Sequence, residues 1–190
     1  MKKRGENLLS SSKKSKLILN NSRGQVWIET AMYLLVALVM IGLVIAFVGP
    51  KITEMQDKAL LQQSATMLKD INNLIFSIAQ GGSGNVREAQ LVIKKGTLTI
   101  DSQNDTIFFE MESSYAYSEI GKKIDIGGIN VSTRKVGRLN IVNMTAVYSN
   151  YDITFGNEDK EKIISMGATP YKLFISNQGG TKTKINFEIN

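Results

Sequence analysis

One long uncharged stretch constrains this chain more than any other feature of its sequence. Residues 30 to 50 carry no charge, and apolar side chains dominate the 23 residues from Val26 to Val48. As an α-helix, this segment would extend about 35 Å at roughly 1.5 Å per residue. That length is sufficient to cross a hydrocarbon core of about 30 Å, so we predict a transmembrane helix.

The length and the ends of this stretch bear on two other interpretations of it. A cleaved secretory signal usually has an apolar region of about 7 to 15 residues followed by a small-x-small cleavage site. The stretch is longer than that, and Ala46-Phe47-Val48 offers no such site. An uncleaved signal anchor stays open as an alternative. It assigns no role to Glu29, although the dipole at a helix amino terminus favours a carboxylate there.

The positive charge of the chain is concentrated ahead of the apolar stretch. The net charge is +6, and residues 1 to 24 hold seven Lys or Arg residues and one Glu, whereas residues 25 to 190 hold sixteen basic and sixteen acidic residues. Because the rest of the chain is neutral, the charge gives no support for a nucleic-acid partner. By the positive-inside rule, we expect a cytoplasmic amino terminus and an external carboxy-terminal region.

Residues 23 to 29 carry a recognisable motif. Arg23-Gly24-Gln25-Val26-Trp27-Ile28-Glu29, followed by the uncharged run, resembles the type IV prepilin motif, specifically its archaeal version, the class III signal peptide. In that family a prepilin peptidase cuts on the cytoplasmic side, after a Gly preceded by a basic residue. The resemblance implies a cut between Gly24 and Gln25, with Glu29 as the fifth mature residue. Trp27 departs from the pattern, which often has Ser at that position.

The resemblance also gives Glu29 a physical role. Cleavage would create an α-amino cation at Gln25, unless that residue cyclises, and packing such helices side by side would bury this cation in apolar surroundings. A carboxylate on a neighbouring helix can pair with the cation, and an isolated buried charge costs several kcal/mol more than a paired one. We therefore expect Glu29 to set the axial stagger of packed subunits. The family implies further partners: a prepilin peptidase, an assembly platform and its ATPase.

The sequence after the apolar stretch predicts a second helical region. In residues 51 to 80, apolar residues recur at three- and four-residue steps, which predicts an amphipathic helix: Leu61, Ala65, Leu68, Ile71, Ile75 and Ile78. It either continues the helix of residues 25 to 50 as one spine or forms a separate helix that begins at Pro50. Residues 81 to 84, Gly-Gly-Ser-Gly, predict the helix end and a flexible joint.

Residues 85 to 190 predict a head rich in β-strands. Short β-type runs alternate with turn signals at Lys95-Gly96, 101 to 105, Gly127-Gly128 and Gly179-Gly180. The predicted strands include residues 97 to 101, 114 to 120 and 151 to 155, and residues 156 to 167 are predicted as a loop with a helical turn. The fold class is therefore α+β, with a long amino-terminal helix followed by an antiparallel, sandwich-like head, an arrangement that resembles pilins and archaellins.

The residue types of the head give little support for catalysis. The chain has no Cys and no His, which removes thiolate nucleophiles, His-based acid–base catalysis and nearly all transition-metal sites. Carboxylate pairs such as Glu110 and Glu112 fit a solvated strand face, and the tyrosines fit packing between strands as well as sugar stacking. We expect no enzymatic activity, no cofactor and no metal.

Three N-glycosylation sequons lie in the predicted external region, at Asn104, Asn130 and Asn143. A three-residue pattern arises easily by chance in an Asn-rich chain, so each match is weak by itself. Asn104 lies in a predicted polar turn and is the best candidate, whereas Asn143 lies in the middle of a predicted strand.

Together these features predict a structural subunit of a type IV pilus-like surface filament. The precursor would be inserted in the membrane with its amino terminus in the cytoplasm. The mature protein would form a helical polymer with copies of itself on the cell surface and serve adhesion or attachment. The main alternative is a pilin-like accessory or binding protein that stays in the membrane and presents its head to a sugar or protein partner.

Overall fold

The computed structural model describes residues 22 to 190, with side chains described from Val26 onward. The predicted leader, residues 1 to 24, therefore lies mostly outside the described residues. One helix, α1 (Ser22–Gln80), precedes ten strands. The chain divides into two compact units, one ending at Phe47 and the other comprising Val48–Asn190.

The helix α1 is continuous through Pro50, which confirms the single-spine alternative over two helices joined at that residue. Proline donates no backbone hydrogen bond, so its position inside a helix leaves a carbonyl of the preceding turn without its usual donor. Next to this position, the hydroxyl of Thr53 donates to the carbonyl of Gly49 at 3.3 Å. This bond does not replace the one that Pro50 cannot make to the carbonyl of Ala46, four residues earlier, yet the helix continues past Pro50.

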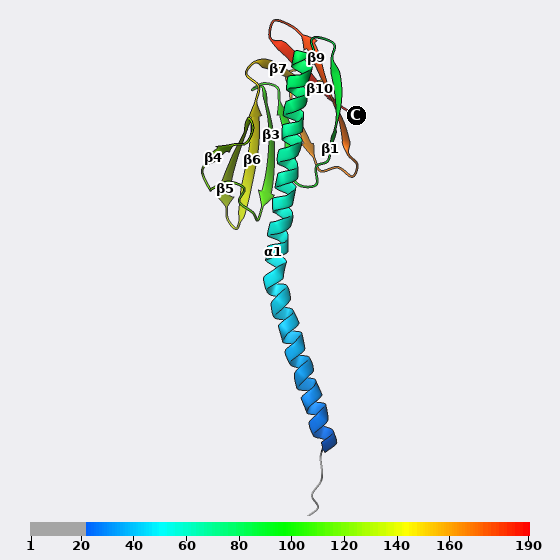
Figure 1. The fold of residues 1–190 in the computed structure, drawn as a ribbon, viewed down its shortest axis with the longest axis vertical. Helices are drawn as coiled ribbons and strands as arrows, with labels where there is room; N and C mark the ends of the chain where they lie inside the picture. The colour runs from blue at the N-terminus through cyan, green and yellow to red at the C-terminus, as the bar shows by residue number, and fades with distance from the viewer. Residues whose placement is uncertain (1–21) are drawn as a thin grey trace, which may run out of the picture. The chain divides into compact units, whose positions relative to one another are not determined.

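The head, Val48–Asn190, contains two β-sheets that flank the carboxy-terminal half of α1 (Figure 1). The first sheet has the order β1 (Val86–Leu91), β9 (Tyr171–Gly179), β10 (Thr183–Ile189) and β7 (Tyr151–Phe155). The second has the order β4 (Lys123–Asp125), β5 (Ile129–Val136), β6 (Leu139–Val147), β3 (Thr106–Ser113), β2 (Thr97–Asp101) and β8 (Glu161–Ser165). The α+β fold class is confirmed.

One pair of strands departs from the predicted antiparallel arrangement. The strands β7 and β10 pair in parallel, with Ile153 opposite Ile185. Parallel neighbours need a long crossover connection, and the chain supplies one because β8 and β9 intervene between them. The first sheet is therefore mixed, whereas all pairs in the second are antiparallel.

The two sheets and α1 share one hydrophobic core. The predicted amphipathic face of the helix is confirmed, because Leu61, Leu68, Ile71, Ile75 and Ile78 are all buried and Ala65 is half-buried. Strands such as β3 and β6 contribute alternate residues with a period of two, as expected for strands with one buried face. This face of α1 is thus the common packing surface for both sheets.

Two segments of the head differ from their sequence predictions. Residues 156 to 167 do not form a helical turn but contain β8, which pairs with β2 so that the buried Ile164 lies opposite Leu98. Residues 114 to 120 form no strand. There, the backbone N–H of Tyr115 donates to the Ser113 hydroxyl at 2.9 Å, and the Ser118 hydroxyl donates to the Thr133 hydroxyl at 2.9 Å. The bond from Tyr115 to Ser113 joins residues two apart, and such local side-chain hydrogen bonds compete with the ladder of a strand.

The end of α1 and the turn that follows it are both hydrogen-bonded to Asn177 of β9. The helix ends at Gln80, as predicted, and Gly82 and Gly84 follow with positive φ values of 80° and 86°. The N–H of Gly84 donates to the carbonyl of Asn177 at 2.7 Å, and the Asn177 side chain donates to the carbonyl of Ile78 at 3.2 Å. The flexibility that the glycine content suggests stays a prediction.

A buried carboxylate joins α1 to two loops of the head. Asp57 is 3% exposed, accepts a hydrogen bond from Lys95 Nζ at 2.6 Å, and accepts a second from the backbone N–H of Ser114 at 2.6 Å. Burial by itself would raise the pKa of Asp57, but the hydrogen bonds from Lys95 and Ser114 and the charge of Lys95 lower it below its ordinary value. Asp57 is therefore held in its ionised form.

We expect Asp57→Asn to lower the free energy of unfolding by about 1–3 kcal/mol, since it removes the charge from two hydrogen bonds at a buried site. Thermal unfolding of the detergent-solubilised chain, followed by the circular dichroism of the strands, measures this loss. The matched control is Asp70→Asn, an exposed acid on the same helix, which should change the free energy by less than about 0.5 kcal/mol.

The same pair of variants has a defined pH dependence. A carboxyl group whose pKa is lowered by folding stabilises the folded state above its unfolded pKa of about 3.9, and this stabilisation is lost as the pH falls through the folded pKa. The stability difference between the wild-type chain and Asp57→Asn should therefore be constant near neutral pH and shrink below about pH 4. A constant difference down to pH 2 would contradict this assignment.

Candidate functional site

The first candidate site is the apolar surface of α1 between Val26 and Val48. Its large side chains are exposed in the single chain, including Trp27 at 78% and Phe47 at 77%. By length and composition this helix is able to cross a membrane. Exposed contiguous apolar surface of this extent requires lipid or another protein to cover it.

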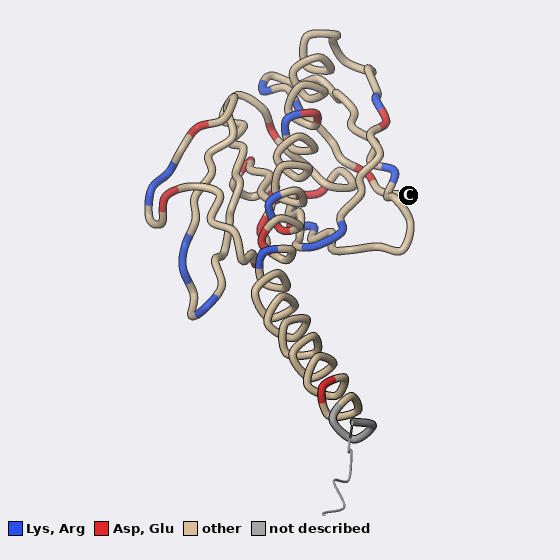
Figure 2. The backbone as a smooth tube through the Cα atoms, turned by 60° about the horizontal axis from the view of Figure 1, so that its bottom comes forward, with Lys and Arg blue, Asp and Glu red and all other residues tan. Residues whose placement is uncertain are grey.

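Glu29 is the charged residue within this apolar segment (Figure 2). Its carboxylate is exposed and accepts a hydrogen bond from the hydroxyl of Tyr33, one helical turn along, at 3.2 Å. A carboxylate has about four acceptor positions, so this bond leaves most of them available to a donor from another molecule. The hydroxyl of Thr30 is instead engaged with the carbonyl of Val26 at 2.9 Å.

The predicted cleavage motif lies at the beginning of the described chain. The backbone of Arg23, Gly24 and Gln25 belongs to the first turn of α1, and the side chains of these residues are outside the described part. The cut between Gly24 and Gln25 therefore stays a prediction. A mature chain that begins at Gln25 would place its α-amino group one helical turn before Glu29.

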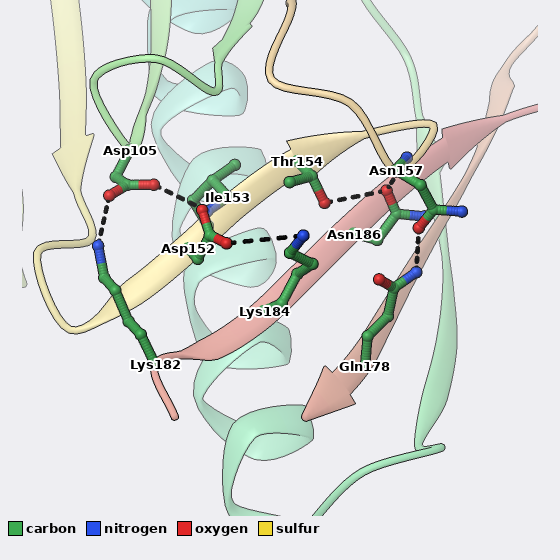
Figure 3. Close-up of polar contacts among 9 residues, drawn as sticks. All are labelled: Asp105, Asp152, Ile153, Thr154, Asn157, Gln178, Lys182, Lys184 and Asn186. Atoms are coloured by element: carbon green, nitrogen blue, oxygen red, sulfur yellow. Dashed lines mark hydrogen bonds and ion pairs between the residues drawn. The ribbon is translucent and has the colours of Figure 1, made fainter. Parts of the chain in front are cut away.

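The sequon at Asn104 lies in an ordered turn between β2 and β3. The exposed Asn104 side chain donates to the carboxylate of Asp101 at 2.7 Å. Its neighbour Asp105 has a positive φ of 50° and accepts hydrogen bonds from the backbone of Ile153 at 2.8 Å and from Lys182 Nζ at 2.6 Å (Figure 3). The sequon thus presents its Asn to solvent on a turn that Asp105 fixes to the other sheet.

The other two sequons lie side by side on the paired strands β5 and β6, on the outer surface of the second sheet. Asn130 of β5 lies opposite Thr145 of β6, and Ser132 lies opposite Asn143. Together with Lys123 and Val147 these four residues line a pocket of about 310 Å³. Asn130 is exposed, whereas Asn143 is half-buried and accepts a hydrogen bond from the Thr145 hydroxyl at 2.5 Å.

The carboxylates and tyrosines of the head do not converge on one site. Glu110 and Glu112 are exposed on the same face of β3, as the sequence predicts. The tyrosines of the head pack against or within the core. Among the residues that the structure describes, no group of three or more acidic side chains is placed to hold a metal ion.

Sequence reasoning missed two residues that organise the head, Asp57 and Asp105. A signal for Asp57 was present, because it lies four residues before Leu61 and so continues the apolar face of the helix as an acid. Asp105 had no such signal beyond its place in a turn, since its partners Ile153 and Lys182 are distant in the sequence.

Comparison with protein-family models, with curated proteins and with solved structures gave no match to this chain. The resemblance to pilins therefore rests on the motif at residues 23 to 29 and on the long apolar helix followed by a β-sheet domain.

The geometry of the sequons predicts a pattern of modification in the chain isolated from its own cells. Asn130 and Asn143 occupy diagonal positions about 7–8 Å apart on one sheet face, so a glycan on Asn130 covers Asn143. We expect glycans at Asn104 or Asn130 and none on Asn143 when Asn130 is modified. Glycopeptide mass spectrometry tests this, with Asn143→Gln as a variant that should leave the intact mass distribution unchanged apart from the substitution. One chain that carries glycans on both Asn130 and Asn143 would refute it.

Proposed function

We propose that this protein is a structural subunit of a type IV pilus-like filament on the cell surface, assembled through the apolar part of α1. The observation that carries the proposal is the exposed apolar surface of Val26–Val48 on a chain whose head has its own buried core. A membrane covers this surface in the precursor, and copies of the same helix cover it in the filament. The proposed role is mechanical rather than catalytic, and adhesion or attachment is the function we assign to the heads.

The mode of association follows from the geometry of a single apolar helix. A helix that is apolar on all sides has no unique partner face, so each copy is able to contact several others. Contacts between different faces of identical subunits are heterologous, and they generate open helical polymers when the rotation does not close. This is the property that a filament needs.

In this proposal Glu29 controls the register of the polymer. A prepilin peptidase removes the leader, which exposes the α-amino group of Gln25, and this cation pairs with Glu29 of a neighbouring helix. The assembly platform and its ATPase supply the energy of extraction from the membrane. The bond from Tyr33 to Glu29 orients the carboxylate, and the free acceptor positions receive the amino group.

The first test is the amino terminus of the native protein. Intact-mass analysis of material isolated from its own cells should give a chain that begins at Gln25, with or without cyclisation of that residue. Sheared extracellular filaments should contain this same species. A chain that retains Met1 through Gly24 would overturn the proposal, and processed protein found only in membranes would favour the accessory-protein alternative.

The second test addresses Glu29 directly. We expect Glu29→Gln to leave cleavage intact and to reduce filament yield by at least about tenfold, because an unpaired buried cation costs more than 1.4 kcal/mol. Filaments sheared from cells and quantified by immunoblotting measure the yield, and the membrane fraction reports cleavage.

Two variants control for this effect. Glu29→Asp retains a carboxylate and should recover part of the yield, and Asp70→Asn removes an exposed acid elsewhere on α1 and should leave the yield unchanged. Filament yield at the wild-type level in Glu29→Gln would remove the proposed role of this residue.

A further inference from the structure

The hairpin between β5 and β6 ends in an exposed basic tip. Arg134, Lys135 and Arg138 surround the turn, and the apolar residues Val136 and Leu139 pair with each other at its base. Val136 is 51% exposed and Leu139 40%. We call residues 134 to 139 the basic tip; Figure 2 shows Lys and Arg gathered on this hairpin.

The three cations of the basic tip have no acidic partner among the described residues. The ion pairs of the head involve other lysines. Three uncompensated cations beside two exposed aliphatic side chains form a surface that suits an anionic interface with apolar material beneath it.

Contacts with α1 determine which end of the head carries the basic tip. At the start of β5, Gly128 lies beside the side chain of Asn72. Ser114 directly follows the last residue of β3, and its backbone N–H donates to the carboxylate of Asp57. Because Ser113 pairs with Asn140 of β6, the hairpin points toward the amino-terminal end of the head helix, where Val48 lies.

The distance from the tip to the level of Val48 follows from the geometry of helix and strand. Val48 precedes Asp57 by nine residues, which is about 14 Å along a helix at roughly 1.5 Å per residue. The tip extends two residues beyond Asn140, or about 7 Å at roughly 3.3 Å per residue. The tip therefore ends about 7–10 Å from the level of Val48.

This spacing matches the polar layer of a bilayer. The apolar run of α1 ends at Val48, so the hydrocarbon boundary lies near that residue when the run is in a membrane. The headgroup layer beyond it is about 5–8 Å thick on each side. Long basic side chains at the tip extend across the remaining distance, since Lys and Arg place their charge well away from the backbone.

We propose that the basic tip binds anionic lipid headgroups on the external side of the membrane while α1 is inserted. Arg134, Lys135 and Arg138 contact the phosphates, and Val136 and Leu139 face the boundary between headgroups and hydrocarbon. The contact orients the head over the bilayer before assembly. This proposal needs membrane insertion of the apolar run but not a filament, so the two proposals fail independently.

The experiment uses the whole chain reconstituted in vesicles, with a dye on a single cysteine. Because the chain has no Cys, Val136→Cys gives a unique label at the tip, and Ser149→Cys gives one beyond the opposite end of β6. Lipids with a nitroxide on the headgroup quench dyes that lie in the headgroup layer. The vesicles are phosphatidylcholine, either alone or with one third phosphatidylglycerol.

We expect the dye at position 136 to be quenched at least twofold more strongly in the anionic vesicles than in phosphatidylcholine, and the dye at position 149 to be unquenched in both. Removing the three cations by Arg134→Gln, Lys135→Gln and Arg138→Gln should abolish the difference. The matched control removes three cations from the opposite end of the head, Lys160, Lys162 and Lys184, and should preserve it.

Two results would overturn the proposal. Equal quenching at position 136 in both vesicle types, or in the two triple variants, would show that anionic headgroups do not hold the tip. If the dye at position 136 becomes buried only in assembled filaments and not in vesicles, the partner of the tip is an acidic surface of a neighbouring subunit instead of lipid. Circular dichroism of each variant confirms that the strands are retained.

Discussion

Both sheets of the head depend on one face of a single helix. Leu61, Leu68, Ile71, Ile75 and Ile78 form a continuous buried stripe on α1, and the inner faces of both sheets pack in the same core. Truncating one such side chain to Ala typically costs about 2–5 kcal/mol. The polar contacts of Asp57 near one end of this stripe and of Asn177 near the other then fix where along the helix the sheets are attached.

The apolar side chains of α1 are distributed differently in its two halves. From Leu61 onward the apolar residues lie on one side and are covered by the head, whereas from Val26 to Val48 they lie on all sides and are exposed. A helix that is apolar all round is stable only in lipid or within a bundle. Because α1 is continuous through Pro50, the covered and the exposed surfaces belong to one helix, without a break in secondary structure.

The sequence predicted the features that depend on local pattern and missed those that depend on distant partners. The stripe from Leu61 to Ile78 has a clear helical period, and β2 and β7 have the bounds expected from their apolar runs. The strand β8 was missed because its charged surroundings suggest a loop, and only the pairing with β2 gives Ile164 a buried position. The amino-terminal motif was predicted from the local sequence, but the diagonal placement of Asn130 and Asn143 depends on the register of β5 and β6, which no local signal specifies.

The strength expected of the basic tip is consistent with the proposal that the protein later leaves the membrane to enter a filament. Each Lys or Arg near an anionic surface contributes about 1 kcal/mol, so three contribute about 3 kcal/mol. That is sufficient to bias the orientation of the head but small compared with moving the run from Val26 to Val48 out of lipid, where each buried CH₂ contributes about 0.8 kcal/mol. In the proposed filament, release of the tip therefore adds little to the cost of extraction, which the packing of the apolar helices against one another would offset.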